Sequence, residues 1–188
     1  MKPFQHFLWE DALCPDCRKE FAGHKHTGKQ HGVCYTALYP YDETFKGYLY
    51  ALKECYDVRI APVFLFPYIR WFKQMKKRFE FVYPCSSETI FLERRFDPCA
   101  LILGSIGIET RPLFKREGHM IQKRLTLNQR HKNAQTIQLV NSPNKERVIM
   151  FDDVMTSGET IQRCIQLLRP HVKEIRVIVL AKPVFKTK

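Results

Sequence analysis

The chain has 188 residues, of which 45% are hydrophobic and 27% charged, with 8 glycines and 11 prolines. This length fits one core domain with a small additional segment, and the composition excludes disordered, collagen-like and repeat proteins. The longest nearly apolar runs, 60–69 and 98–108, are about half as long as a membrane-spanning helix. The N-terminus shows no secretory signal, so we expect a cytoplasmic protein without membrane insertion.

Residues 1–40 are polar and rich in cysteine and histidine. Cys14 and Cys17 form a C-x-x-C knuckle, and His31 and Cys34 repeat this spacing with an imidazole in place of one thiol. Four such ligands favour a closed, structural Zn²⁺ site. The alternative is free thiols in a poorly ordered arm.

The chain has seven cysteines, and an odd number without an export signal argues against a disulfide framework. Four of them lie in apolar or helical surroundings and are expected to be small core residues: Cys55, Cys85, Cys99 and Cys164.

Residues 41–79 are aromatic-rich and predict a helical linker or hood region. Apolar spacing favours two helices joined through the turn region 62–67. The second, over 68–78, is basic and amphipathic. Such a helix can contact a membrane or nucleic acid, but packing of its apolar stripe on the neighbouring domain is the favoured interpretation.

Residues 80–188 are predicted to form the core domain, because short apolar strands alternate there with helical stretches. This alternation is typical of an α/β fold with a parallel sheet flanked by helices. The expected strands are 81–83, 108–114, 137–140, 148–151 and 175–181, and the expected helices are 94–104 and 159–168.

Basic residues exceed acidic ones by 12, and the excess is concentrated. Residues 111–133 hold seven lysines and arginines against one acid, Glu117. Such a segment attracts phosphates, on a small polyanion or on a nucleic-acid backbone. A solvated surface loop would have the same composition.

The most informative stretch is RVIMFDDVMTSGETI, at 147–161. An apolar strand leads into Asp152 and Asp153, and a loop of small hydroxylated residues with one glycine then opens a helix. Backbone N–H groups, hydroxyls and the helix dipole converge there on an anion such as a phosphate, for which the expected ligands are Thr156, Ser157, Gly158 and Thr160. The carboxylates suit sugar hydroxyls or a hydrated Mg²⁺. A Ser/Thr-rich helix cap is the alternative, but it leaves the second aspartate unexplained.

This order of strand, Asp-Asp, Thr-Ser-Gly-x-Thr and helix resembles the 5-phosphoribosyl-1-pyrophosphate (PRPP) signature of type I phosphoribosyltransferases. Further blocks resemble the competence-associated ComF/ComFC family: CPDC at 14–17, YDETFKGYLYALK at 41–53, YPCSSETIFLERRFDPC at 83–99 and QKRLTLNQRHKN at 122–133. The resemblance covers nearly the whole chain. Where the family has Arg-Gly-Phe-Asn-Gln, however, this chain has Arg-Arg-Phe-Asp-Pro at 94–98.

The resemblance implies a type I phosphoribosyltransferase-like sheet with a small N-terminal zinc-knuckle-like segment. It implies that Asp152 and Asp153 hold the ribose hydroxyls and order Mg²⁺. The pyrophosphate would bind at the turn formed by Cys85, Ser86 and Ser87, with Arg94 or Arg95 as its support or as a surface charge. Flap or nucleic-acid contacts would come from Arg116, Lys123, Arg124 and Arg130.

Three functions are compatible with these features. The first is a ComFC-like protein of natural transformation that binds PRPP with Mg²⁺ and acts in uptake or handling of single-stranded DNA, with a competence helicase as a further partner. The second is a nucleobase-salvage phosphoribosyltransferase, which requires a base-recognising loop and gains nothing from a zinc knuckle. The third is a catalytically silent interaction module. It is favoured because Asp97 and Pro98 stand where the family motif has asparagine and glutamine.

Overall fold

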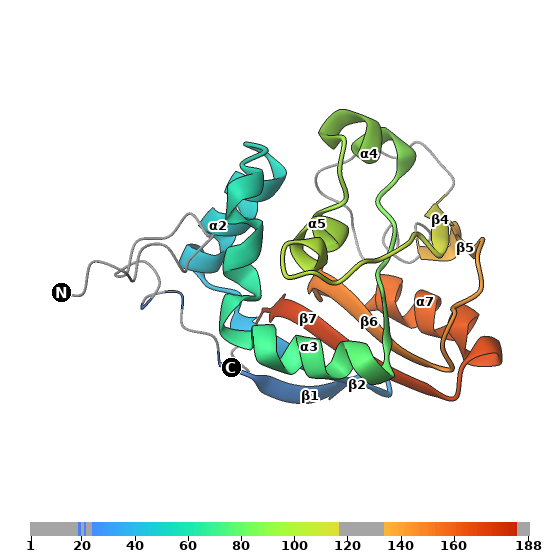
Figure 1. Cartoon of the computed structure of the whole chain (residues 1–188). Helices are drawn as coiled ribbons and strands as arrows, with labels where there is room; N and C mark the ends of the chain where they lie inside the picture. Colours follow the sequence, from blue (N-terminus) through green and yellow to red (C-terminus); the bar gives the residue numbers. More distant parts are fainter. Residues whose placement is uncertain (1–18, 20, 22–23, 117–133, 184–188) are drawn as a thin grey trace.

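The computed structural model of the protein describes residue 19, residue 21 and residues 24–116 and 134–183. Its main sheet has five strands in the order β1-β2-β7-β6-β3 (Figure 1). The strands are β1 (His26–Gln30), β2 (Val33–Pro40), β3 (Glu80–Val82), β6 (Arg147–Val154) and β7 (Glu174–Lys182). β1 pairs antiparallel with β2, and the other pairings are parallel.

The strand β6, which lies between β7 and β3, is buried on both faces of the sheet, as parallel strands usually are. Ile149 and Phe151 point into one hydrophobic core, and Val148 and Met150 point into the other. The first core contains side chains of α2 (Glu43–Lys53), α3 (Ile69–Arg78) and α5 (Pro98–Gly104). The second contains side chains of α7 (Glu159–Leu168). The sheet is therefore a middle layer between helices.

The 3₁₀ helices and a small second sheet complete the fold. η2 (Val58–Phe64) and η3 (Phe66–Tyr68) connect α2 to α3, and η4 (Arg169–His171) follows α7. β4 (Phe114–Arg116) and β5 (Ile137–Leu139) pair antiparallel, apart from the main sheet. The expected strand 108–114 was wrong in its bounds, because residues 108–113 form no strand and β4 begins at Phe114. β4 and β5 also lie outside the main sheet, whereas the alternation pattern predicts parallel strands of one sheet.

The expected helix 94–104 is two helices, α4 (Glu88–Arg94) and α5. Arg95 follows α4 with φ = +65°, a left-handed conformation that ends a helix. Asp97 then caps α5, and Pro98 stands at its first position, where a missing N–H costs nothing. The same proline disfavours helical backbone at the residue before it, so one continuous helix is excluded.

β1 and β2 were not predicted from the sequence. They lie within the expected Cys/His-rich segment 1–40, yet β2 pairs with β7 and its residues Ala37 and Leu38 are buried. The main sheet therefore contains strands from residues 1–40 as well as from residues 80–188. In the part of the chain that the structure describes, no helix is long and apolar enough to cross a membrane.

Helix α3 packs its apolar stripe against the sheet, which confirms the favoured interpretation of this basic helix. Phe72 and Met75 are buried, while Lys73, Lys76 and Lys77 are exposed. The Phe72 ring lies 5.4 Å from that of Phe81 in β3 and 6.0 Å from that of Phe151 in β6. The stripe is thus part of the first core.

Replacing this ring tests the packing. Phe72→Ala should lower the free energy of unfolding by about 3–5 kcal/mol, because it removes a fully buried aromatic side chain and leaves a cavity. The exposed neighbour provides the control, since Lys73→Ala should change stability by less than about 0.5 kcal/mol. Urea denaturation followed by circular dichroism measures both, and equal effects would contradict the packing of α3.

Candidate functional site

The predicted phosphate loop connects the end of β6 to the start of α7. Gly158 caps α7 with φ = +78°, a conformation that glycine adopts without the strain a side chain would cause. The loop and the first turn of α7 line a pocket together with Arg116 and Asp152. The lining includes the four residues expected to bind phosphate: Thr156, Ser157, Gly158 and Thr160.

A second pocket lies beside the first, at the turn that follows β3. Its lining includes the three residues expected to bind pyrophosphate: Cys85, Ser86 and Ser87. Arg116, Asp152 and Thr160 line both pockets. The regions expected to bind the two ends of one phosphorylated ligand therefore meet at the carboxyl end of β6, where open α/β sheets bind ligands.

The two adjacent carboxylates at the end of β6 have different partners. Asp153 forms an ion pair with Lys53, the last residue of α2. Burial lowers the pKa of Lys53, but the charge of Asp153 and its hydrogen bond raise it more, so the net shift is upward. Asp152 instead accepts a hydrogen bond of 2.9 Å from the backbone N–H of Asp153. Lys53 thus compensates one of the two negative charges.

Burial and the neighbouring charge of Asp153 raise the pKa of Asp152 to about 8. Lys53 and the hydrogen bond from Asp153 act in the opposite direction but do not cancel this rise. The raised pKa favours the protonated form of the Asp152 carboxyl in the ligand-free protein. A cation or a set of donors that binds the carboxylate must displace this proton.

The site residues were also tested as metal ligands. The ligand atoms of Cys99, Asp152 and Asp153 all lie within 4.8 Å of one another. Mg²⁺ prefers oxygen ligands and is commonly held by one or two carboxylates, substrate phosphates and water. The two aspartates fit that ion, whereas the thiol does not suit a hard cation. Burial, followed by the charges of the nearby aspartates, raises the pKa of the Cys99 thiol well above its usual value.

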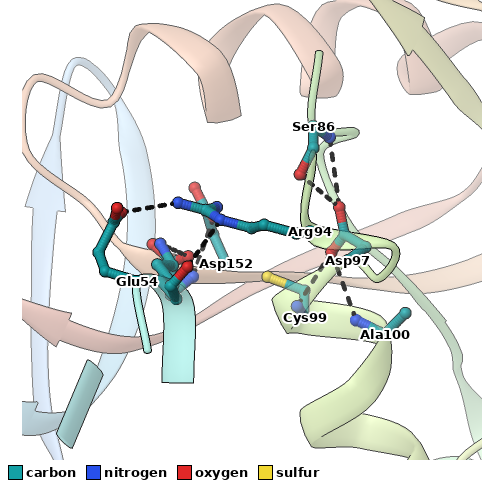
Figure 2. Close-up of polar contacts among 9 residues, drawn as sticks. Glu54, Ser86, Arg94, Asp97, Cys99, Ala100 and Asp152 are labelled. Atoms are coloured by element: carbon teal, nitrogen blue, oxygen red, sulfur yellow. Dashed lines mark hydrogen bonds and ion pairs between the residues drawn. The ribbon is translucent and has the colours of Figure 1, made fainter. Parts of the chain in front are cut away.

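Asp97 ties the turn that follows β3 to helix α5. Its carboxylate accepts hydrogen bonds from Ser86, through the hydroxyl at 2.8 Å and the backbone N–H at 3.2 Å. It also accepts from the backbone N–H of Cys99 at 3.0 Å and of Ala100 at 3.5 Å (Figure 2). Burial raises the pKa of Asp97, and these donors oppose the rise. The aspartate therefore fixes the turn through its acceptor oxygens.

Arg94 was expected to support the turn at residues 85–87, but its hydrogen bonds go to the end of α2. Its guanidinium donates to the backbone carbonyl of Lys53 at 3.0 Å and to the carboxylate of Glu54 at 2.9 Å (Figure 2). It thus holds the end of α2, from which Lys53 reaches Asp153. Arg95 is exposed on the surface.

Arg116 is the predicted flap residue that the structure describes. It ends β4 and lines both pockets, and its Nε is buried without a hydrogen-bond partner among the described residues. A cation in this position suits an anionic ligand that spans the two pockets. The other predicted flap residues, Lys123, Arg124 and Arg130, lie outside the described residues.

The predicted zinc ligands are described only in part. His31 and Cys34 are exposed, at and beside the turn between β1 and β2. Cys14 and Cys17 lie outside the described residues. Among the four expected core cysteines, Cys99 and Cys164 are buried and Cys85 is half-buried. Cys55 is exposed, so its assignment to the core was wrong; it follows α2 at a surface turn.

Four residues near the site were not assigned to it from the sequence: Gln30, Lys53, Asp97 and Cys99. Lys53 ends the block YDETFKGYLYALK. This block contributed to the family resemblance, but no function was assigned to its lysine. Asp97 was noted only because it stands where the family motif Arg-Gly-Phe-Asn-Gln has an asparagine. Cys99 was expected in the core, and nothing near Gln30 in the sequence points to the phosphate loop.

The fold and the site define a mixed α/β protein with a mostly parallel sheet and a polar site at the carboxyl end of β6. No protein-family model matches the sequence. No curated protein matches it. Among solved structures, a hypoxanthine phosphoribosyltransferase from Staphylococcus aureus is similar, with 13% sequence identity and a TM-score of 0.34. The match covers 60% of this chain and 59% of that chain, so this chain spans less than two thirds of the neighbour's length.

The raised pKa of Asp152 predicts a pH-dependent stability. Between about pH 4, where an unfolded aspartate titrates, and about pH 8, the folded state holds a proton that the unfolded chain releases. Stability from this group therefore falls as pH rises through that window, by less than about 1.4 kcal/mol per pH unit. Asp152→Asn removes the group, so the variant should gain stability relative to wild type as pH rises.

Urea midpoints at pH 5, 6.5 and 8 measure this difference. Glu88→Gln, at an exposed carboxylate in the first turn of α4, is the control and should show a constant difference from wild type. A constant difference for Asp152→Asn as well would show that the pKa of Asp152 is not raised.

Proposed function

We propose that this protein binds PRPP together with Mg²⁺ and acts as a phosphoribosyltransferase-like protein. One observation carries the proposal: the phosphate loop and the turn after β3 line adjoining pockets that share Asp152, Thr160 and Arg116. A ligand with a phosphate at one end, a sugar in the middle and a pyrophosphate at the other end matches this order of groups.

In this proposal, the loop 156–160 binds the 5′-phosphate, and Asp152 and Asp153 bind the ribose hydroxyls. Cys85, Ser86 and Ser87 receive the pyrophosphate, with Arg116 beside it. Asp152 and Asp153 would hold Mg²⁺, and the ion would supply charge neutralisation on the pyrophosphate. The protein's contribution is to orient the ligand and to stabilise the charge of the leaving group.

The transfer step follows from this orientation. A nitrogen nucleophile forms a bond to C1 of the ribose while the bond from C1 to the pyrophosphate oxygen breaks, and the bonding electrons leave with pyrophosphate. The proton of the nucleophile passes to solvent. Arg116 faces the position where negative charge increases, and it acts without a proton transfer.

At the cellular level, we propose a ComFC-like role in natural transformation, in uptake or handling of single-stranded DNA with a competence helicase. The family resemblance of the sequence blocks supports this role. A structural Zn²⁺ held by Cys14, Cys17, His31 and Cys34 belongs to the same proposal. The alternative is a catalytically silent module, which the ion pair between Lys53 and Asp153 favours because one carboxylate is already occupied.

Calorimetric titration of PRPP with Mg²⁺ tests ligand binding. Wild type should bind, and replacing Asp152 and Asp153 together by Asn should weaken binding by at least about tenfold, since charge-assisted contacts are lost. Glu88→Gln should bind as wild type does. Because Asp152 must release its proton, wild-type binding should strengthen as pH rises from 6 to 8 and should release protons to the buffer.

The same titration with and without oligo-dT tests the link to single-stranded DNA. A change in PRPP affinity with DNA would support the transformation role. Absence of PRPP binding in both conditions would reject the proposed ligand and leave the silent module as the better account of the site.

A further inference from the structure

The phosphate loop is held from behind by Gln30, the last residue of β1. The side-chain amide nitrogen of Gln30 donates to the backbone carbonyl of Thr156 at 3.1 Å and to that of Ser157 at 2.7 Å. It also lies 3.4 Å from the position that a Cβ on Gly158 would occupy. Gln30 thus contacts consecutive residues of the loop, although it is distant from them in sequence and does not line their pocket.

These two hydrogen bonds fix the direction of two peptide groups. In a planar trans peptide, the carbonyl and the N–H of the next residue point in opposite directions. The carbonyls of Thr156 and Ser157 point to Gln30, so the N–H groups of Ser157 and Gly158 point away from it. Successive N–H groups with a common direction form a concave site for an anion.

Lys182, at the end of β7, sets the orientation of the Gln30 amide. Its ammonium group donates to the side-chain carbonyl oxygen of Gln30. An ammonium group can only donate hydrogen bonds, so the side-chain oxygen of Gln30 must face Lys182. The amide nitrogen of Gln30 then faces the loop. The Met155 N–H also donates to the Ala181 carbonyl at 3.1 Å, which fixes the start of the loop to the same strand end.

The hairpin that carries Gln30 is itself constrained. Gln30 pairs with Val33 across a two-residue turn of His31 and Gly32, and both turn residues have positive φ, at 49° and 79°. This is the turn that matches the twist of a two-stranded hairpin. β2 is in turn paired with β7, so Gln30 is connected to the rigid part of the sheet.

We propose that Gln30, oriented by Lys182, is a positioning residue for phosphate binding at the loop 156–158. It holds the loop in the conformation that presents the Ser157 and Gly158 N–H groups to the ligand, and it does not contact the ligand. This inference rests on the proposed function, because it assigns the phosphate end of the ligand to this loop.

Gln30→Leu tests the proposal, since leucine has a similar size and no donor. Its affinity for ribose 5-phosphate should fall about tenfold, as expected when the loop loses two hydrogen bonds. Its affinity for pyrophosphate with Mg²⁺, a ligand of the other pocket, should stay within about twofold, because Gln30 makes no contact there. Gln74→Leu, on the exposed surface of α3, is the matched control and should leave both affinities unchanged.

Hydrogen exchange of the segment 155–159 gives a readout that does not depend on ligand. Gln30→Leu and Lys182→Met should both speed exchange there, while α7 keeps its protection. Unchanged exchange and an unchanged ribose 5-phosphate affinity would overturn the inference. Equal loss of both ligand affinities would also overturn it, because that pattern indicates a general structural defect.

The outcome for wild type separates this inference from the proposed function. If wild type binds neither ribose 5-phosphate nor PRPP, the proposed function fails, and the phosphate role of Gln30 fails with it. If wild type binds both and Gln30→Leu does so equally well, the inference about Gln30 fails alone.

Discussion

The ion pair between Lys53 and Asp153 is the interaction on which the organisation of the site depends. Two carboxylates follow each other at the end of a strand that is buried on both faces, and their mutual repulsion in a region of limited solvent access is costly. Lys53 reduces this cost for Asp153, and the unpaired repulsion and burial raise the pKa of Asp152. α2 must therefore end beside β6, and Arg94 holds that end by binding the Lys53 carbonyl and the Glu54 carboxylate.

Asp97 has a structural role that its position in the sequence did not reveal. In the structure the aspartate accepts hydrogen bonds from Ser86, Cys99 and Ala100, and the proline stands where a helix begins. The Ser86 hydroxyl and the free N–H groups at the start of α5 need hydrogen-bond acceptors, and the Asp97 carboxylate provides them. Asp97 and Pro98 therefore fix the turn and the start of α5 together.

The loop between β6 and α7, the helix α7 and the strands β6 and β7 could be predicted because their signals are local. Gly158, the Ser/Thr-rich loop and the apolar run before it lie within one stretch, and the helix 159–168 was predicted with the bounds that the structure shows. The break between α4 and α5 also has a local cause, because Asp97 followed by Pro98 is typical of a helix start. The prediction missed it because the neighbouring residues have a helical pattern.

The remaining features depend on contacts between distant parts of the chain. β2 carries alternating apolar residues, but its cysteine and histidine neighbours suggested a metal-binding segment instead. The pairing of Lys53 with Asp153 and of Gln30 with the phosphate loop joins segments that nothing in their own sequence connects. These contacts between distant residues depend on the order of the strands in the sheet. Local sequence patterns do not specify that order.

That strand order also has a consequence for how the chain folds. β2 is synthesised early, but its parallel partner β7 emerges only after α7, near the other end of the described chain. Until then β2 presents an unpaired edge and apolar side chains, which is the kind of surface that leads to aggregation. Closing such a long loop is slow, since its entropy is lost before the strand contacts form. Folding should therefore be limited by the docking of the early hairpin onto the late strand, and the two pockets should form only in that last step.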